Sequence, residues 1–252
     1  MKQAGKALAA VAVLGMAVAA GALSEVRDLE GFDRIMFALP GKLTLERGDE
    51  FEVVIDAVQE DLDRIETRVR GDELSIRWKE GLFGVLGGRP ADDIAVRVTL
   101  PGLVGLELAG SGDVEGGSWL SETFLVEVNG SGSARFDELA GEELTLEVSG
   151  SGNVQVPKVD SALVRIEISG SGDVELAGAA DRQQIEIMGS GDVEATELEG
   201  ARVEVEIMGS GDVGVWANET LSAEIMGSGD IRYKGSPRVT TQEHGSGSVR
   251  PL

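Results

Sequence analysis

Seven glutamates recur at one position of a repeat in the second half of the chain, so the first question is what a row of carboxylates could bind. They are Glu107, Glu127, Glu147, Glu167, Glu186, Glu206 and Glu224. If the repeats stack, neighbouring carboxylates lie about 5 Å apart and repel by about 0.8 kcal/mol in water. One hypothesis is that a cation or a basic partner relieves this repulsion, because hard cations bind several oxygens. We favour the alternative of a solvated outer face that keeps the protein soluble.

A second row of oxygen-bearing side chains follows a glycine-rich tripeptide. It comprises Asp113, Ser133, Asn153, Asp173, Asp192, Asp212, Asp230 and Ser248. These oxygens could ligate calcium or could cap the backbone amides of a turn. Only one such turn occurs in each repeat, so we predict caps.

Three methionines, Met188, Met208 and Met226, directly precede the tripeptide in successive repeats. A row of exposed thioether side chains often marks a surface that binds a partner or a second copy of the chain. The alternative is packing under a loop or against a neighbouring protomer, and the sequence leaves both open.

A catalytic constellation is not evident. The chain has no cysteine and one histidine, His244, which we expect at the surface. It also lacks a phosphate-binding loop. A polysaccharide lyase would need acids and a base in one groove. We expect the arginines of the repeats to be scattered over different repeat positions: Arg135, Arg165, Arg182, Arg202 and Arg232. We therefore expect no catalytic residue, no cofactor and no enzyme activity.

The element that positions all these rows is the tripeptide Gly-Ser-Gly. It begins at Gly110, Gly130, Gly150, Gly170, Gly189, Gly209, Gly227 and Gly245. A nearly constant repeat length of this kind is typical of a solenoid. Apolar residues stand two and four positions before each of the first seven tripeptides, with glutamate between them, so this arm reads as a half-buried strand.

Two folds fit this alternation: a parallel β-solenoid, and a meander of hairpins bent at the tripeptide. Like residues recur at like positions in every repeat, which stacking in register produces. We therefore predict an all-β, single-stranded parallel β-solenoid with Gly-Ser-Gly turns over residues 106–252. Glycine suits the corner because it adopts positive φ and carries no Cβ toward the adjacent coil.

Residues 24–105 lack the tripeptide and read as an irregular N-terminal part of the same solenoid, so that 24–252 form one structural domain. Candidate strands are residues 34–37, 42–45, 51–55, 65–69, 74–78 and 94–100. An apolar, glycine-rich insert at residues 82–88 is expected to form a loop or a flap.

Residues 1–22 resemble a signal peptide, with Lys2 and Lys6 before an apolar run and small residues at the cleavage site. An uncleaved anchor is the alternative, because the run reaches the lower limit for a bilayer span. The formal net charge of −23 excludes a nucleic-acid binder and disfavours an anionic membrane surface. We expect an exported, acidic protein in the periplasm, at the cell surface or secreted, with no membrane span after cleavage.

Several motifs carry a resemblance to a known family: the eight tripeptides, Gly-Phe-Asp-Arg-Ile at residues 31–35 and Leu-Pro-Gly-Leu at residues 100–103. The chain resembles the bacterial family called putative auto-transporter adhesin, head GIN domain, over about residues 28–250. This resemblance implies a right-handed β-helix, pectin-lyase-like in outline but without the catalytic residues, and export to the envelope. It offers no ligand or catalytic residues to carry over.

The expected function is therefore that of a non-catalytic envelope or surface binding protein, adhesin-like, with a glycan or a protein as ligand. Two alternatives remain open: a β-helix carbohydrate-active enzyme of the polysaccharide lyase type, and an envelope scaffold that forms homo-oligomers through its solenoid end.

Overall fold

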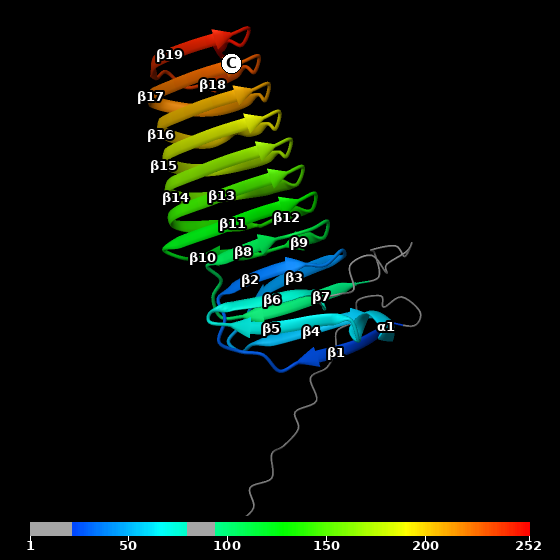
Figure 1. Cartoon of the computed structure of the whole chain (residues 1–252). Coiled ribbons are helices and arrows are strands. Elements are labelled where there is room, and N and C mark those ends of the chain that lie inside the picture. The colour runs from blue at the N-terminus through cyan, green and yellow to red at the C-terminus, as the bar shows by residue number, and fades with distance from the viewer. Residues whose placement is uncertain (1–21, 80–93) are drawn as a thin grey trace, which may run out of the picture.

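The computed structural model describes residues 22–79 and 94–252. Residues 1–21 of the predicted signal peptide and the predicted insert at residues 82–88 lie outside the described residues. Figure 1 shows a stack of parallel coils in the C-terminal half, with the N-terminal strands packed against the first coil. The chain is an all-β protein and its repeats form a parallel β-solenoid, as the sequence predicts.

Each coil has a long arm, which runs into the first glycine of the tripeptide, and a short arm, which follows the tripeptide. The first coils use separate strands: β8 (Gly105–Leu108), β9 (Asp113–Glu115), β10 (Ser118–Leu120), β11 (Thr123–Gly130) and β12 (Ser133–Arg135). In later coils one strand runs from a short arm through a loose turn into the next long arm: β13 (Glu138–Gly150), β14 (Asn153–Gly170), β15 (Val174–Gly189), β16 (Val193–Gly209) and β17 (Val213–Gly227). The stack ends with β18 (Ile231–Lys234), β19 (Arg238–Gly245) and β20 (Val249–Pro251).

Equivalent repeat positions are paired from coil to coil. In the pairing of β14 with β15, Glu167 lies opposite Glu186 and Ile168 opposite Ile187. The register shifts between neighbouring coils all fall between the short arm and the following long arm. The loose turn thus absorbs the one- or two-residue variation in repeat length, and the tripeptide corner stays in register.

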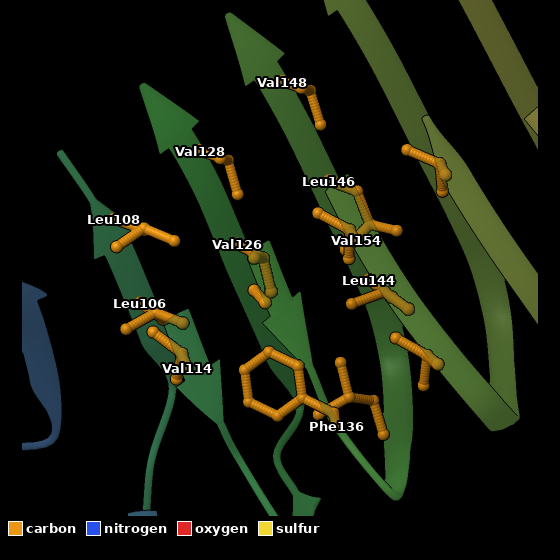
Figure 2. Close-up of a cluster of buried hydrophobic side chains, with 14 of the residues drawn as sticks. Leu106, Leu108, Val114, Val126, Val128, Phe136, Leu144, Leu146, Val148 and Val154 are labelled. Carbon is orange, nitrogen blue, oxygen red and sulfur yellow. The ribbon is translucent and has the colours of Figure 1, made fainter. Parts of the chain in front are cut away.

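The core is the interior of the stack. The two apolar residues of each long arm form continuous columns whose members are 3% exposed or less. Figure 2 shows Leu106, Val126 and Leu146 repeating in successive coils, with Leu108, Val128 and Val148 forming the second column. One buried cluster extends from Phe32 to Ile231, so the N-terminal strands and the coils share a single hydrophobic core.

The tripeptide corner brings backbone against backbone. The first glycine has positive φ, for example 145° at Gly189. A Cβ at Gly189 would lie 2.1 Å from the carbonyl oxygen of Gly170 in the preceding coil. The amide of Ser190 donates a hydrogen bond of 2.8 Å to that same oxygen. Only glycine permits both the dihedral angle and this approach.

The N-terminal part differs from the coils. Its strands are β1 (Leu23–Arg27), β2 (Arg34–Ala38), β3 (Lys42–Arg47), β4 (Glu52–Ala57), β5 (Ile65–Arg70), β6 (Glu73–Trp78) and β7 (Ala95–Leu100), with the short helix α1 (Gln59–Leu62). Strands β2 and β3 stack in parallel on β8 and β9 and so continue the solenoid. Strands β1, β4 and β7 pair antiparallel, and so do β5 and β6.

Strands β6 and β7 pair in parallel with β2 and β3, so four strands of this part extend the parallel stack. In contrast, β1, β4 and β5 pair only antiparallel. The six predicted strands are present with shifted ends, whereas β1 and α1 were not predicted. The physical reason is local for β5 and β6: Gly71, with φ of 65°, closes a tight turn that returns the chain beside itself.

Candidate functional site

The aspartate row caps backbone amides, but across coils rather than within its own turn. Asp192 Oδ1 accepts a hydrogen bond of 2.7 Å from the amide of Asp212, and Asp212 Oδ1 accepts one of 2.8 Å from the amide of Asp230. Asn153 makes the same bond to Asp173 at 3.0 Å. One oxygen of each side chain thus joins two successive coils, which favours the structural role over calcium binding at this oxygen.

A groove with a volume of about 670 Å³ runs along the short arms of β12 and β14 to β18. Its floor and walls come from equivalent positions of successive coils: Ser133, Arg135, Asn153, Gln155, Asp173, Glu175, Asp192, Glu194, Asp212 and Arg232. Five carboxylates occupy the middle, and an arginine stands at each end. Both arginines hold the same repeat position, five residues after the first glycine. That shared position was the signal that could have revealed the groove, and the sequence analysis missed it.

The polar groups of the groove are tied to one another. Arg135 donates a hydrogen bond to Gln155, whose Nε2 donates one of 2.7 Å to Glu175. Next to the Arg232 end, hydrogen bonds from the Ser248 hydroxyl and amide hold the pKa of Asp230 below its usual value. The groove is therefore lined by pre-oriented carboxylate, amide and guanidinium groups.

The expectation that the arginines are scattered is wrong for Arg135 and Arg232, since both line this groove together with acids from several coils. However, they stand five coils apart, which is about 24 Å at a strand spacing of about 4.8 Å. They cannot act on the same bond of a ligand. The groove is therefore an extended surface whose polar side chains are spread along its length.

The glutamate row lies on the long arms, around the corner from the groove. Glu127 is half-buried, and its pKa is raised first by burial and then by the neighbouring charges of Glu107 and Glu147. A smaller hollow of about 250 Å³ includes Glu167, Glu186, Glu204 and Glu206 beside Arg165. Within residues 22–79 and 94–252, no group of three or more His, Asp or Glu side chains is placed to hold a metal ion.

The methionine row lies beside the corner on the same outer face as the glutamates. Met188 pairs with Met208, Met208 with Met226, and Met226 with His244 of the last coil. Met188 and Met226 are 45% and 39% exposed. Met208, between them, is half-buried, and His244 is exposed, as the sequence predicts.

These features define the class of the protein: a parallel β-solenoid whose outer faces carry rows of side chains in register from coil to coil. Within that class, the chain belongs to the family described as putative auto-transporter adhesin, head GIN domain, whose model matches residues 31–237. No curated relative matches the chain.

Solved structures share the fold over nearly the whole chain. A putative lipid binding protein from Parabacteroides distasonis is 25% identical, with a TM-score of 0.86 over 92% of this chain and 97% of its own. A putative adhesin from Parabacteroides merdae is 21% identical, with a TM-score of 0.82 over 92% of this chain and 96% of its own. A putative adhesin from Bacteroides fragilis is also 21% identical, with a TM-score of 0.72 over 94% and 100% of the two chains. Across the described part of our chain, no helix has the length and apolarity to cross a membrane.

Proposed function

We propose that this chain is an exported, non-catalytic binding protein of the adhesin-like kind, which holds an extended glycan along the short-arm groove. The observation that carries the proposal is the groove itself, in which equivalent polar side chains of successive coils line a continuous path of about 670 Å³. A polymer of repeating sugars can meet a repeating row of hydrogen-bonding groups. The adhesin names of the family and of two similar structures support this reading.

The chemistry of the lining favours a hydroxyl-rich ligand. Carboxylates accept hydrogen bonds, guanidinium groups donate them, and amides do both. Because Arg135 and Gln155 already hold Glu175 in place, little side-chain entropy is lost when a ligand binds. The large separation of the two arginines supports holding a chain at several points and disfavours bond cleavage.

A glycan array probed with the protein lacking residues 1–22 tests the proposal. We expect binding to extended glycans, and at least a tenfold loss when Arg135→Ala and Arg232→Ala are combined. The matched control is Arg182→Ala, an exposed arginine on a long arm outside the groove. Full binding by the double variant would reject the groove.

Two further readouts separate the alternatives. Shortened or unsaturated products in the mass spectrum of the bound glycan would show a polysaccharide lyase and overturn the non-catalytic proposal. Flotation with liposomes, without glycan binding, would favour a lipid ligand, which is what the name of the Parabacteroides distasonis structure states for that protein.

A further inference from the structure

The last coils place three thioethers and one imidazole in consecutive positions of a single row. Met188, Met208, Met226 and His244 each directly precede the tripeptide and pair in register through β15, β16, β17 and β19. Neighbouring members are therefore about 4.8 Å apart at the backbone. Three of the six methionines in the chain stand in this row.

The row is confined to this end of the stack. In the preceding coils the same position carries Ala109, Asn129, Ser149 and Ser169, which lack soft donor atoms. The interior positions of the same strands are filled by isoleucine, valine, leucine, alanine and one glutamine, so the methionines are not needed to complete the core. Met188 and Met226 are exposed and Met208 is half-buried, so the row faces solvent.

The three thioether groups of the row select one class of metal ion. A thioether sulfur is a neutral, soft donor that suits Cu(I), whereas calcium and magnesium select oxygen ligands. Methionine has three rotatable side-chain bonds, so neighbours in register can turn their sulfur atoms toward one ion.

The electrostatic surroundings favour a cation. Glu186, Glu206 and Glu224 lie two residues before the three methionines on the same outer face of the strands, about 7 Å away along the chain. The arginines of β15 and β16, Arg182 and Arg202, lie six residues before the methionines, which is about 20 Å in an extended strand. A monovalent ion at the row therefore sits in the field of nearby carboxylates.

We propose that Met188, Met208 and Met226 bind one soft monovalent metal ion, Cu(I) or its chemical analogue Ag(I), through their three thioether groups. His244 stands at the end of the row, about 14 Å from Met188 at the backbone, and is not a ligand. This site is independent of the short-arm groove, which lies on the other side of the tripeptide corner. It needs no redox step, because the ion is bound in the oxidation state in which it arrives.

The first test is a titration of the full chain with silver nitrate in a chloride-free buffer, followed by isothermal calorimetry and by NMR of labelled methionine methyl groups. We expect one Ag(I) per chain and shifts at the three row methionines. Met36 is the internal reference, because it lies in β2, where its Sδ accepts a hydrogen bond of 3.9 Å from Ser75. Methyl signals of the row that do not move at saturating Ag(I) would overturn the proposal.

The second test uses the triple variant Met188→Leu, Met208→Leu and Met226→Leu, with Met36→Leu as the matched control. Leucine conserves the apolar surface and approximate volume, so a hydrophobic docking surface would survive while the metal site would not. We expect at least a 100-fold loss of Ag(I) affinity in the triple variant, and no loss in Met36→Leu or in His244→Ala. Wild-type affinity in the triple variant, or equally tight methionine-dependent binding of Zn²⁺, would refute a soft-metal site.

Discussion

The tripeptide corner allows a sharp test of how the coils are held together, through the single substitution Gly189→Ala. Gly189 has φ of 145°, a region that non-glycine residues rarely adopt. Such backbone strain costs about 1–3 kcal/mol. The new Cβ would also lie 2.1 Å from the Gly170 carbonyl oxygen. Since non-bonded carbon atoms pack at about 3.5–4.0 Å, the two coils would have to separate by roughly 1 Å.

This separation breaks the hydrogen bond of 2.8 Å between the Ser190 amide and the Gly170 carbonyl. The bond is worth about 1 kcal/mol. Together with the strain, the expected loss is about 3 kcal/mol of unfolding free energy, which lowers the melting temperature of a domain of this size by roughly 6–12 °C. Circular dichroism at the strand minimum measures the shift.

Two controls isolate the cause. Gly102→Ala adds the same methyl group at a glycine with no atom within 4 Å of the new Cβ, and its melting temperature should stay within about 1 °C of wild type. Gly245→Ala repeats the clash at 2.0 Å from the Gly227 carbonyl, but in the last coil, which is free to fray. Its effect should be about half that of Gly189→Ala. A melting temperature for Gly189→Ala equal to that of Gly102→Ala would refute the reasoning.

Three further predictions concern single side chains. Asp192→Ala removes the acceptor of the Asp212 amide and should cost about 1 kcal/mol in urea unfolding, whereas Asp192→Asn should be nearly neutral. The pKa of Glu127 is raised, so ionisation of this carboxyl destabilises the fold as the pH rises above 4.5. Glu127→Gln should therefore be more stable than wild type at pH 7. Calorimetry should show that the difference in unfolding free energy disappears near pH 4.5. Gln183 is fully buried and its Oε1 has no hydrogen-bond partner, so Gln183→Leu should stabilise the fold by about 1 kcal/mol. A destabilised variant would show that the lost hydrogen bond from Nε2 to the Leu198 carbonyl outweighs the cost of the unpaired Oε1.

The sequence predicts the coils well because stacking in register turns sequence period into spatial neighbourhood. When residue i lies over residue i + 20, the columns of valine, isoleucine and glutamate can be read directly from aligned repeats. The glycine corners follow from the same logic, since a Cβ at each would meet the preceding coil. The three methionines were likewise identified in one row, whereas the position of His244 next to Met226 became apparent only from the pairing of β17 with β19.

The antiparallel N-terminal strands could not be predicted in the same way. Strand β4 pairs with β1 and β7, which are distant in the sequence and have no shared repeat to align. Such pairings depend on which strand edges lie next to one another in the folded chain. Strand patterns alone therefore located most of these strands but not their partners.

By itself, the sequence determined the solenoid, the residues of its interior and the charge rows on its surface, because each follows from local alternation repeated at a constant step. Only the tertiary structure decided that Arg135 and Arg232 share a groove, that each aspartate of the row accepts a hydrogen bond from the amide of the next coil, and that β1, β4 and β5 pair antiparallel. These features depend on the path of the loose turns and on the direction of individual side chains. A repeat length does not encode either one.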